Sequence, residues 1–248
     1  MRSFLAAIQF LTVIPVHVSF SERDLGRSVM FFPLTGLLMG AVVSAADFCI
    51  KGHIFPLWLA STIDIVILAV LSGGLHLDGL ADSADGLFSA RPRDRMLEIM
   101  RDSRIGTMGV LALVMVLLIK IGALASLPDK SRWAIIMLAP LSGRCMIVAC
   151  MSFFTYARKS PGLPQLFLEY RSRGKGVLVL FIPALAGLLL AGLQGLVASL
   201  ISTLCGLLAV FYVHRKIGGY TGDTLGAVSE FSEMIVLAAA VAIAPIGL

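Results

Sequence analysis

Charged side chains gather in one stretch of this otherwise apolar chain, between Gly73 and Gly106. It holds six of the 15 acidic residues, which are Asp78, Asp82, Asp85, Asp94, Glu98 and Asp102. It also holds five arginines, which are Arg91, Arg93, Arg95, Arg101 and Arg104. Because the sequence on both sides is apolar enough to enter a membrane, we expect the chemistry of the protein to lie in this stretch.

Three of these acids are spaced for one face of a helix. Asp78, Asp82 and Asp85 stand at positions i, i+4 and i+7, within about 60° of one another around a helix axis. Like charges on one face repel, and a divalent cation would reverse the sign of that energy. Carboxylate oxygens suit Mg²⁺, which also binds substrate phosphates. The pattern predicts a Mg²⁺ site with catalytic roles for Asp82 and Asp85; the alternative is a solvated acidic face.

A second polar motif, GGYTGDTLGA, occupies residues 218–227. Glycines let a backbone approach a ligand closely. The candidate substrate contacts in and beside the motif are Lys216, Gly219 and Gly222. Asp223 is expected to act in catalysis and to share in metal binding. A flexible turn between two spans is the alternative, but it does not account for Asp223 or for the nearby acids Glu230 and Glu233.

Further candidate substrate contacts surround the first motif. Arg101 and Arg104 flank Asp102, and a guanidinium group binds phosphate oxygens in pairs, so we expect all three residues to contact substrate. His76 adjoins the acidic face and could contact phosphate or carry a proton. The alternatives are anchoring at the membrane surface for the arginines and no chemical role for the histidine. Anchoring is the preferred interpretation for Arg91, Arg93 and Arg95.

The composition is that of a polytopic membrane protein. The 248 residues have a mean hydropathy of +0.94, and 58% are hydrophobic while 14% are charged; soluble domains carry about 25% charged residues. Basic loops of a membrane protein account for the net charge of +5, so we expect no nucleic-acid partner. The four cysteines lie in apolar segments without a CxxC pair, which predicts neither disulfides nor a zinc site.

Apolar segments of spanning length predict an all-α fold with about seven transmembrane helices. The expected spans are 29–50, 54–75, 107–127, 133–156, two within 177–213 that turn at Gln194–Gly195, and a last one that ends at Leu248. Residues 1–16 predict a short helix that lies at the membrane interface or re-enters it. With no long polar segment, residues 1–248 are expected to form a single integral-membrane catalytic domain.

Two charged residues, Asp64 and Arg144, fall within expected spans. Charges inside a membrane are costly and often functional. They could instead pair with each other, and the sequence leaves this open.

The basic residues predict the orientation of the spans. Seven spans place the polar segments 17–28, 76–104, 157–176 and 214–232 on one side, with two, five, five and two of the 20 Lys and Arg residues. Lys51, Lys130 and Arg132 fall on the other side. Since cytoplasmic loops carry the excess of basic residues, the richer side is cytoplasmic. Both acidic motifs then share the cytoplasmic face of the cell's inner membrane, as one active site requires.

Three motifs together resemble the cobalamin synthase family, whose members are also called adenosylcobinamide-GDP ribazoletransferases or cobalamin-5′-phosphate synthases. The motifs are GGLHLDGLADSADGLFSA, MRDSRIGTMG and IGGYTGDTLGA, and the N-terminal FLAAIQFLTVIPV and FFPLTGLLMGAV add to the likeness. The resemblance implies a Mg²⁺-dependent enzyme of the cytoplasmic membrane. Its substrates would be adenosylcobinamide-GDP and α-ribazole or α-ribazole 5′-phosphate, and GMP would be released. The sequence leaves open whether the protein forms a homo-oligomer.

The residues fit this chemistry. A ribose hydroxyl would attack the phosphorus attached to the cobinamide, and such a transfer depends on positioning and on stabilising charge. Mg²⁺ on Asp78, Asp82 and Asp85 would neutralise the pyrophosphate. One of these acids or Asp223 could take the hydroxyl proton.

Two other functions must be weighed. Membrane CDP-alcohol phosphotransferases use a D-x2-DG-x2-AR pattern, but here Ala90–Arg91 follows one residue late and the later paired aspartates are missing. A small secondary transporter would explain the spans and their internal charges. It would place its densest charges at mid-membrane depth, whereas this chain is expected to carry its acids between spans. The enzyme is therefore the preferred interpretation.

Overall fold

Apolar runs separated by proline, glycine and charged residues form the helices of the computed structural model, which describes residues 1–52, 54–158 and 163–244. The helices are α1 (Arg2–Leu11), α2 (Glu22–Ser28), η1 (Val29–Phe31), α3 (Phe32–Ile50), α4 (Leu57–Leu71), α5 (Leu75–Leu87), α6 (Arg93–Ile99), α7 (Thr107–Ser126), α8 (Asp129–Phe153), α9 (Leu163–Glu169), α10 (Arg173–Ile217) and α11 (Gly222–Ile243). These residues contain no strand, so the predicted all-α class is confirmed.

Local chemistry sets many helix ends. Prolines at positions 56, 92 and 128 precede α4, α6 and α8, where a missing N–H costs no helical hydrogen bond. Ser21 and Thr221 form capping boxes with the third residue of α2 and of α11.

Five stretches are long and apolar enough to cross a membrane. They are Glu22–Ile50, which includes α2, η1 and α3, together with α7, α8, α10 and α11. A sixth span arises only if α4 and α5 are taken together, and these two helices meet at an angle of 90°. Gly73 and Gly74 make this bend with φ angles of +61° and +72°, which favour glycine. Because α5 carries the acids of the polar stretch that the sequence places between spans, we describe it outside the spans, and its position relative to a membrane stays a prediction.

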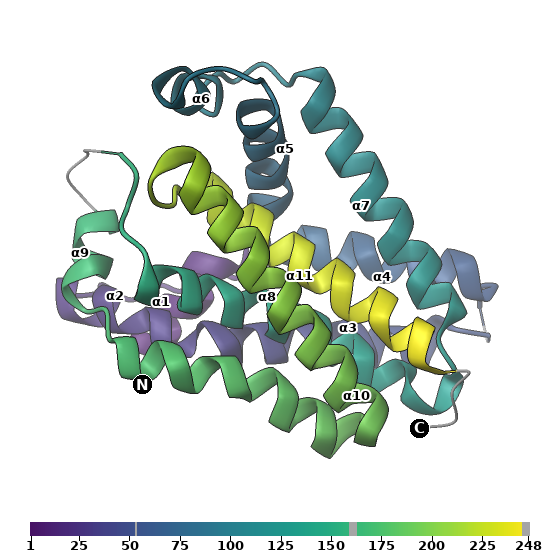
Figure 1. The fold of residues 1–248 in the computed structure, drawn as a ribbon. Coiled ribbons are helices and arrows are strands. Elements are labelled where there is room, and N and C mark those ends of the chain that lie inside the picture. The colour runs from purple at the N-terminus through teal and green to yellow at the C-terminus, as the bar shows by residue number, and fades with distance from the viewer. Residues whose placement is uncertain (53, 159–162, 245–248) are drawn as a thin grey trace.

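The long helix α10 is broken at Ala191 and Gly192, whose backbone angles are not helical. Its two halves fold back on each other (Figure 1), and the backbones of Gly187 and Gly195 touch across the turn. The predicted turn at Gln194–Gly195 is therefore placed about three residues too late. Counting the halves separately leads toward the seven spans expected, although that exact number stays a prediction.

Helix α8 forms the centre of the bundle, between α3, α10 and α11 (Figure 1). Nearly all of its residues between Ala134 and Ser152 are buried. The predicted N-terminal helix is present as α1, which packs on α2 and α3, and its depth in a membrane stays a prediction. Residues 159–162 of the expected loop 157–176 and the predicted end at Leu248 lie outside the described residues, while α9 and the start of α10 occupy much of the rest of that loop.

The sequence left open whether Asp64 and Arg144 pair with each other inside the bundle, and the structure shows that they do not. Asp64 binds Arg132 rather than Arg144, with 2.9 Å between the charged atoms, and Asp47 binds the same guanidinium at 2.7 Å. Arg132 is fully buried, so its assignment to an external loop was wrong.

A second buried cluster contains Lys120, Arg144, Glu230 and Glu233. Lys120 bridges both glutamates, and Arg144 binds Glu233. The expectation that Glu230 and Glu233 belong to a polar loop was wrong, because α11 begins at Gly222 and both residues face its buried side.

Candidate functional site

The two acidic motifs meet where α5 crosses α11. A methyl group added at Gly79 would lie 2.6 Å from the carbonyl oxygen of Asp223, and one at Gly226 would lie 3.0 Å from the Cα of His76. The two backbones are thus in direct contact, which side chains at these positions would prevent. The crossing joins motifs that are about 140 residues apart in sequence.

The crossing places Asp223 close to the acids of α5. Asp78, Asp82 and Asp85 all lie on this helix, as their spacing predicts. Partial burial, followed by the charges of Asp78, Asp223 and Asp85, raises the pKa of Asp82 to about 6. Asp82 is therefore repelled by three neighbouring carboxylates from the two helices, which favours a bound cation.

Arg158 is the basic partner of Asp223. Its guanidinium lies 3.0 Å from an oxygen of Asp223, and both side chains are partly buried. Lys216 lies over the ring of Tyr212 near the end of α10, 5.6 Å from the ring centroid. Its predicted role as a substrate contact stays a prediction.

Asp85 is already engaged by the backbone. Its two oxygens accept hydrogen bonds from the N–H groups of Gly106 and Gly109 at 2.7 and 2.8 Å. These are free donors in the first turn of α7, so Asp85 caps that helix and fixes it to α5. Its predicted metal and catalytic roles stay predictions, since a carboxylate retains other lone pairs.

His76 lies behind the acids and is only 3% exposed. Its Nδ1 atom is 3.2 Å from a guanidinium nitrogen of Arg144. Burial and the neighbouring positive charge of Arg144 hold the pKa of His76 well below its ordinary value. The ring is therefore neutral, and it joins the crossing to the buried cluster rather than offering a positive charge to phosphate.

An apolar cavity of about 170 Å³ opens beside the acids. His76, Asp78 and Asp223 contribute its polar wall, and Gly222 lines it with no atom within 4 Å of an added Cβ. Its apolar wall comes mainly from Phe10, Leu11, Phe32, Ile147, Met151 and Phe167. A ligand with a flat apolar group could bind here with a hydroxyl directed at the carboxylates.

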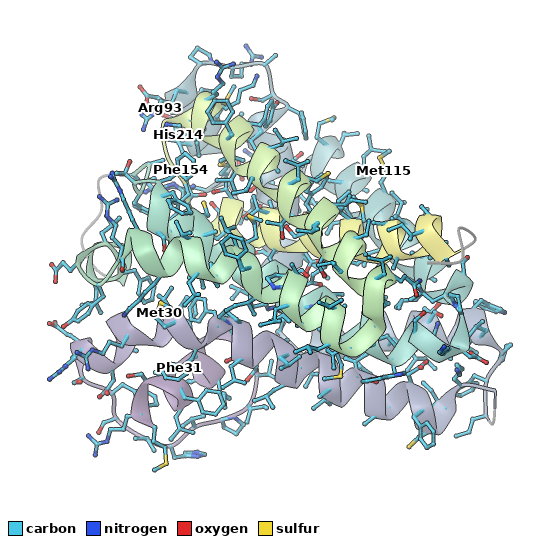
Figure 2. All side chains as sticks on the ribbon, turned by 60° about the horizontal axis from the view of Figure 1, so that its bottom comes forward. Met30, Phe31, Arg93, Met115, Phe154 and His214 are labelled. Atoms are coloured by element: carbon cyan, nitrogen blue, oxygen red, sulfur yellow. The ribbon has the colours of Figure 1, made fainter. Side chains whose placement is uncertain are left out.

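A second, polar cleft of about 470 Å³ is lined by Arg158, the partner of Asp223. Arg93 and Arg101 also line it, together with the acids Asp94 and Glu98. Arg93 donates hydrogen bonds to the carbonyl oxygens of Ile217 and Ala157, both at 2.7 Å, and so fixes α6 to the end of α10. Figure 2 shows Arg93 near His214 at this end of the molecule. We call this the arginine cleft.

The remaining candidates are placed less directly. Asp102 and Arg104 pair with each other at 2.7 Å on an exposed turn, and this hydrogen bonding lowers the pKa of Asp102 to about 2. A methyl group at Gly219 would lie 2.3 Å from the carbonyl oxygen of Thr155. Gly219 is thus required by chain packing, whereas Gly222 leaves space for a ligand.

Comparison with known proteins identifies the family. A family model described as cobalamin-5-phosphate synthase matches residues 3–241. The chain belongs to this family. Adenosylcobinamide-GDP ribazoletransferases from Geotalea daltonii and Klebsiella pneumoniae are 38% and 41% identical to it, over 98% and 96% of this chain and 98% of each relative. One from Pseudomonas fluorescens is 41% identical over 96% of this chain and 98% of its own length. No solved structure matches.

Membership of the cobalamin-5-phosphate synthase family confirms the resemblance seen in the sequence, but it does not test individual site residues. Within the described ranges 1–52, 54–158 and 163–244, no three His, Cys, Asp or Glu side chains are close enough to hold a metal ion together. The donors nevertheless suit Mg²⁺ chemically, because they are carboxylates whose mutual repulsion a cation would relieve. The Mg²⁺ site therefore stays a prediction.

Sequence reasoning missed two features of the site in this family member. Arg158 is one of five basic residues in a polar segment, and nothing in its neighbours marks it as the partner of Asp223. Gly79 and Gly226 give a weak signal, since small residues commonly mark close helix crossings, but their contact depends on the tertiary fold.

Proposed function

We propose that this chain is an adenosylcobinamide-GDP ribazoletransferase of the membrane, joining adenosylcobinamide-GDP to α-ribazole or its 5′-phosphate and releasing GMP. The product is adenosylcobalamin or its 5′-phosphate. The observation that carries this proposal beyond family membership is the crossing of α5 and α11. It brings Asp78 and Asp223, from two separate motifs, to the wall of one cavity, and Arg158 connects Asp223 to the arginine cleft.

The apolar cavity would hold the base of the ribazole, with a ribose hydroxyl next to Asp223. The arginine cleft would hold the guanosine diphosphate part, where Arg158 and Arg101 neutralise phosphate charge. The hydroxyl oxygen forms a bond to the phosphorus attached to the cobinamide, and the bond from that phosphorus to the GMP oxygen breaks. Asp223 takes the hydroxyl proton, and Arg158 leaves Asp223 for the pyrophosphate.

Asp78 and Asp82 on α5 would hold Mg²⁺. The negative charge of Asp223 acts on Asp82, so it lies close enough to attract the same ion. The ion would supply positive charge to the pyrophosphate and to the departing GMP oxygen. Asp85 keeps these acids in position by its bonds to the start of α7. The positions of the acids between spans, together with the distribution of basic residues, support an active site on the cytoplasmic face of the inner membrane.

The test is GMP release by purified protein in detergent, with and without Mg²⁺. We expect Asp223→Ala to slow turnover at least about a hundredfold, as losing a general base does. Asp129→Ala is the matched control, since Asp129 pairs with Lys51 on an exposed surface at 2.6 Å. If Asp223 formed only a surface ion pair, which contributes about 0–1 kcal/mol, its loss would leave the rate nearly intact. An Asp223→Ala enzyme that keeps most of its rate would therefore overturn the proposed catalytic role.

The proposed face can be tested separately by attaching membrane-impermeant reagents to single cysteines. A cysteine at Arg91, in the turn before α6, should be protected in intact cells and labelled after lysis. A cysteine at Lys130, at the start of α8, should be labelled in intact cells. Labelling of both positions from the same side would contradict the proposed topology.

A further inference from the structure

A third cavity, of about 150 Å³, lies between the N-terminal helix α2, the end of α8 and the start of α10. We call it the basic pocket, because Arg27, Arg171 and Lys175 line it and no acidic side chain of the described residues does. Ser152 and Ser172 add hydroxyl groups to its wall. A site with three positive charges, hydroxyl donors and no carboxylate is suited to an anion.

The positive charges of the basic pocket are not neutralised within the protein. Across the described part of the chain, the salt bridges involve other basic residues, and Arg27, Arg171 and Lys175 form none. The same helices contain available acids, since Glu22 lies on α2 and Glu169 ends α9. All three side chains are exposed, so they lie open to an anion that enters the pocket from solution.

Close packing holds this pocket in shape. A methyl group at Gly26 would lie 2.2 Å from the ring of Tyr170, so α2 and the end of α9 can meet only because residue 26 is a glycine. Both Gly26 and Tyr170 line the pocket. A methyl group at Gly176 would likewise meet the side chain of Ser152, at 2.4 Å, where α10 packs on α8. Arg27 and Lys175 are thus brought to one pocket from opposite ends of the sequence.

The basic pocket is next to the apolar cavity of the active site. Met151 and Phe167 line both, so the two cavities adjoin at these side chains. A ligand whose apolar group fills the cavity beside Asp223 could extend an anionic group past Phe167. The arginine cleft shares no lining residue with the basic pocket, so the two basic regions would contact different parts of the bound substrates.

We infer that the basic pocket binds a phosphate group. Two sources carry this chemistry: the 5′-phosphate of the second substrate, which rests on the proposed function, and the headgroup of an anionic phospholipid at the membrane surface. The position beside the apolar cavity favours the substrate. In that case the pocket makes the protein prefer α-ribazole 5′-phosphate to α-ribazole.

The first experiment measures kcat/KM for α-ribazole 5′-phosphate and for α-ribazole in the wild type and in Arg27→Gln and Arg171→Gln. The ratio of the two values should fall by about tenfold to a hundredfold in each variant, as expected for a lost charged hydrogen bond to phosphate. Arg23→Gln and Arg173→Gln are matched controls. Arg23 lies on the same helix as Arg27, and Arg173 lies two residues from Arg171. Both control arginines are exposed and neither lines the pocket, so these variants should keep the wild-type ratio.

The second experiment separates the lipid source. The same proteins are reconstituted in phosphatidylcholine vesicles with and without phosphatidylglycerol, and retained phosphatidylglycerol is measured by native mass spectrometry. If the headgroup occupies the pocket, both pocket variants lose retained lipid while the controls keep it, and the substrate ratio stays constant. If the 5′-phosphate of the substrate occupies the pocket, the substrate ratio falls in both pocket variants, and all the proteins retain the same amount of lipid.

Pocket variants that match their controls in both experiments would overturn the inference. The proposed function fails in a different way, namely if the wild type releases no GMP with either substrate. In that case, binding of a phosphate group in the basic pocket is still tested by calorimetric titration of the purified protein with α-ribazole 5′-phosphate and by the lipid measurement. Loss of either binding in Arg171→Gln, but not in Arg173→Gln, would support the phosphate site.

Discussion

The acids at the crossing of α5 and α11 and the acids inside the bundle are the same kinds of residue in opposite situations. Glu230 and Glu233 are buried and share Lys120 and Arg144, so two negative charges meet two positive charges. The crossing gathers Asp78, Asp82, Asp85 and Asp223, and the salt bridge to Arg158 is the one that any of them forms in the described part of the chain.

Under the proposed function, this difference separates structural charge from functional charge. A buried pair that is fully matched maintains the fold, because removing one partner leaves a charge in a medium of low polarity. A cluster of acids with too few cations is unfavourable by itself and becomes favourable when a cation or a charged substrate arrives. Burial alone would have pointed to the other set, since the most deeply buried of these charges are the paired ones.

The largest expected effect tests the unmatched set. Asp82→Asn keeps the shape of the side chain and removes the charge that would hold Mg²⁺, so turnover should fall on the order of a thousandfold. Asp94→Asn is the control, because Asp94 pairs with Arg93 on the surface at 2.9 Å. GMP release at limiting Mg²⁺ measures both. A near-normal rate for Asp82→Asn under that condition would show that the unmatched charges are not functional.

Substitutions in the matched set, which is Lys120, Arg144, Glu230 and Glu233, should instead change the stability of the fold. Lys120→Met leaves two buried glutamates without their shared cation and should destabilise the fold by about 3–5 kcal/mol. Lys51→Met breaks the exposed pair with Asp129 and should cost about 0–1 kcal/mol. Unfolding of both variants in detergent provides the measurement. Adding Glu230→Gln to Lys120→Met should restore part of the stability, and equal stability for Lys120→Met and Lys51→Met would remove the distinction drawn here.

The crossing itself can be changed without touching a charge. Gly79→Ala places a methyl group against the backbone of Asp223 and should separate the two acidic motifs. A displacement of about 1 Å can cost about a hundredfold in rate, so we expect a loss of about tenfold to a hundredfold in kcat with a small change in stability. Gly122→Ala, with no atom within 4 Å, is the control and should keep full activity. Equal activity of the two variants would show that close approach is unnecessary.

The smallest effect concerns pH. The pKa of Asp82 is raised from 3.8 to about 6 in the folded protein, so folding favours its protonated form. In EDTA, the stability that this protonation provides is present below about pH 4 and is lost as the pH rises through about 6. Asp82→Asn should lack this dependence, and Mg²⁺ at pH 7 should raise the melting temperature of the wild type by on the order of a few degrees. A pH profile shared by wild type and Asp82→Asn would exclude this site as its source.

The sequence was sufficient for the all-α class and for placing the three acids on one helix, but not for the short helices α2, α6 and α9 within the expected polar segments. Hydropathy reports how apolar a segment is, and the spacing of Asp78, Asp82 and Asp85 follows directly from helical geometry. The bend after α4 was missed although Gly73 and Gly74 signal it, because the apolar run continues into Leu75.

The pairing of charges could not be predicted in the same way. Glu233 lies 113 residues from Lys120 and 89 from Arg144, and Arg158 lies 65 residues from Asp223. Partners at such separations depend on how helices pack, and a single sequence does not encode that in any local pattern. The error over Glu230 and Glu233 has this cause, since their charge suggested a loop while their partners place them in the core.

The right-angle bend between α4 and α5 also bears on the size of the substrate that the proposed site would accept. It turns the acid-bearing helix away from α4, so that α5 packs against α11, α7 and α6 (Figure 1). The apolar cavity beside α5 has about 170 Å³ and the arginine cleft beside α6 about 470 Å³, whereas a pocket that encloses a drug-sized ligand has about 300–1,000 Å³. The apolar cavity would thus enclose only part of a nucleoside, and a corrin ring with its adenosyl group would rest outside both. Selectivity would then be exercised at the nucleotide end, leaving the ring free to vary in its substituents.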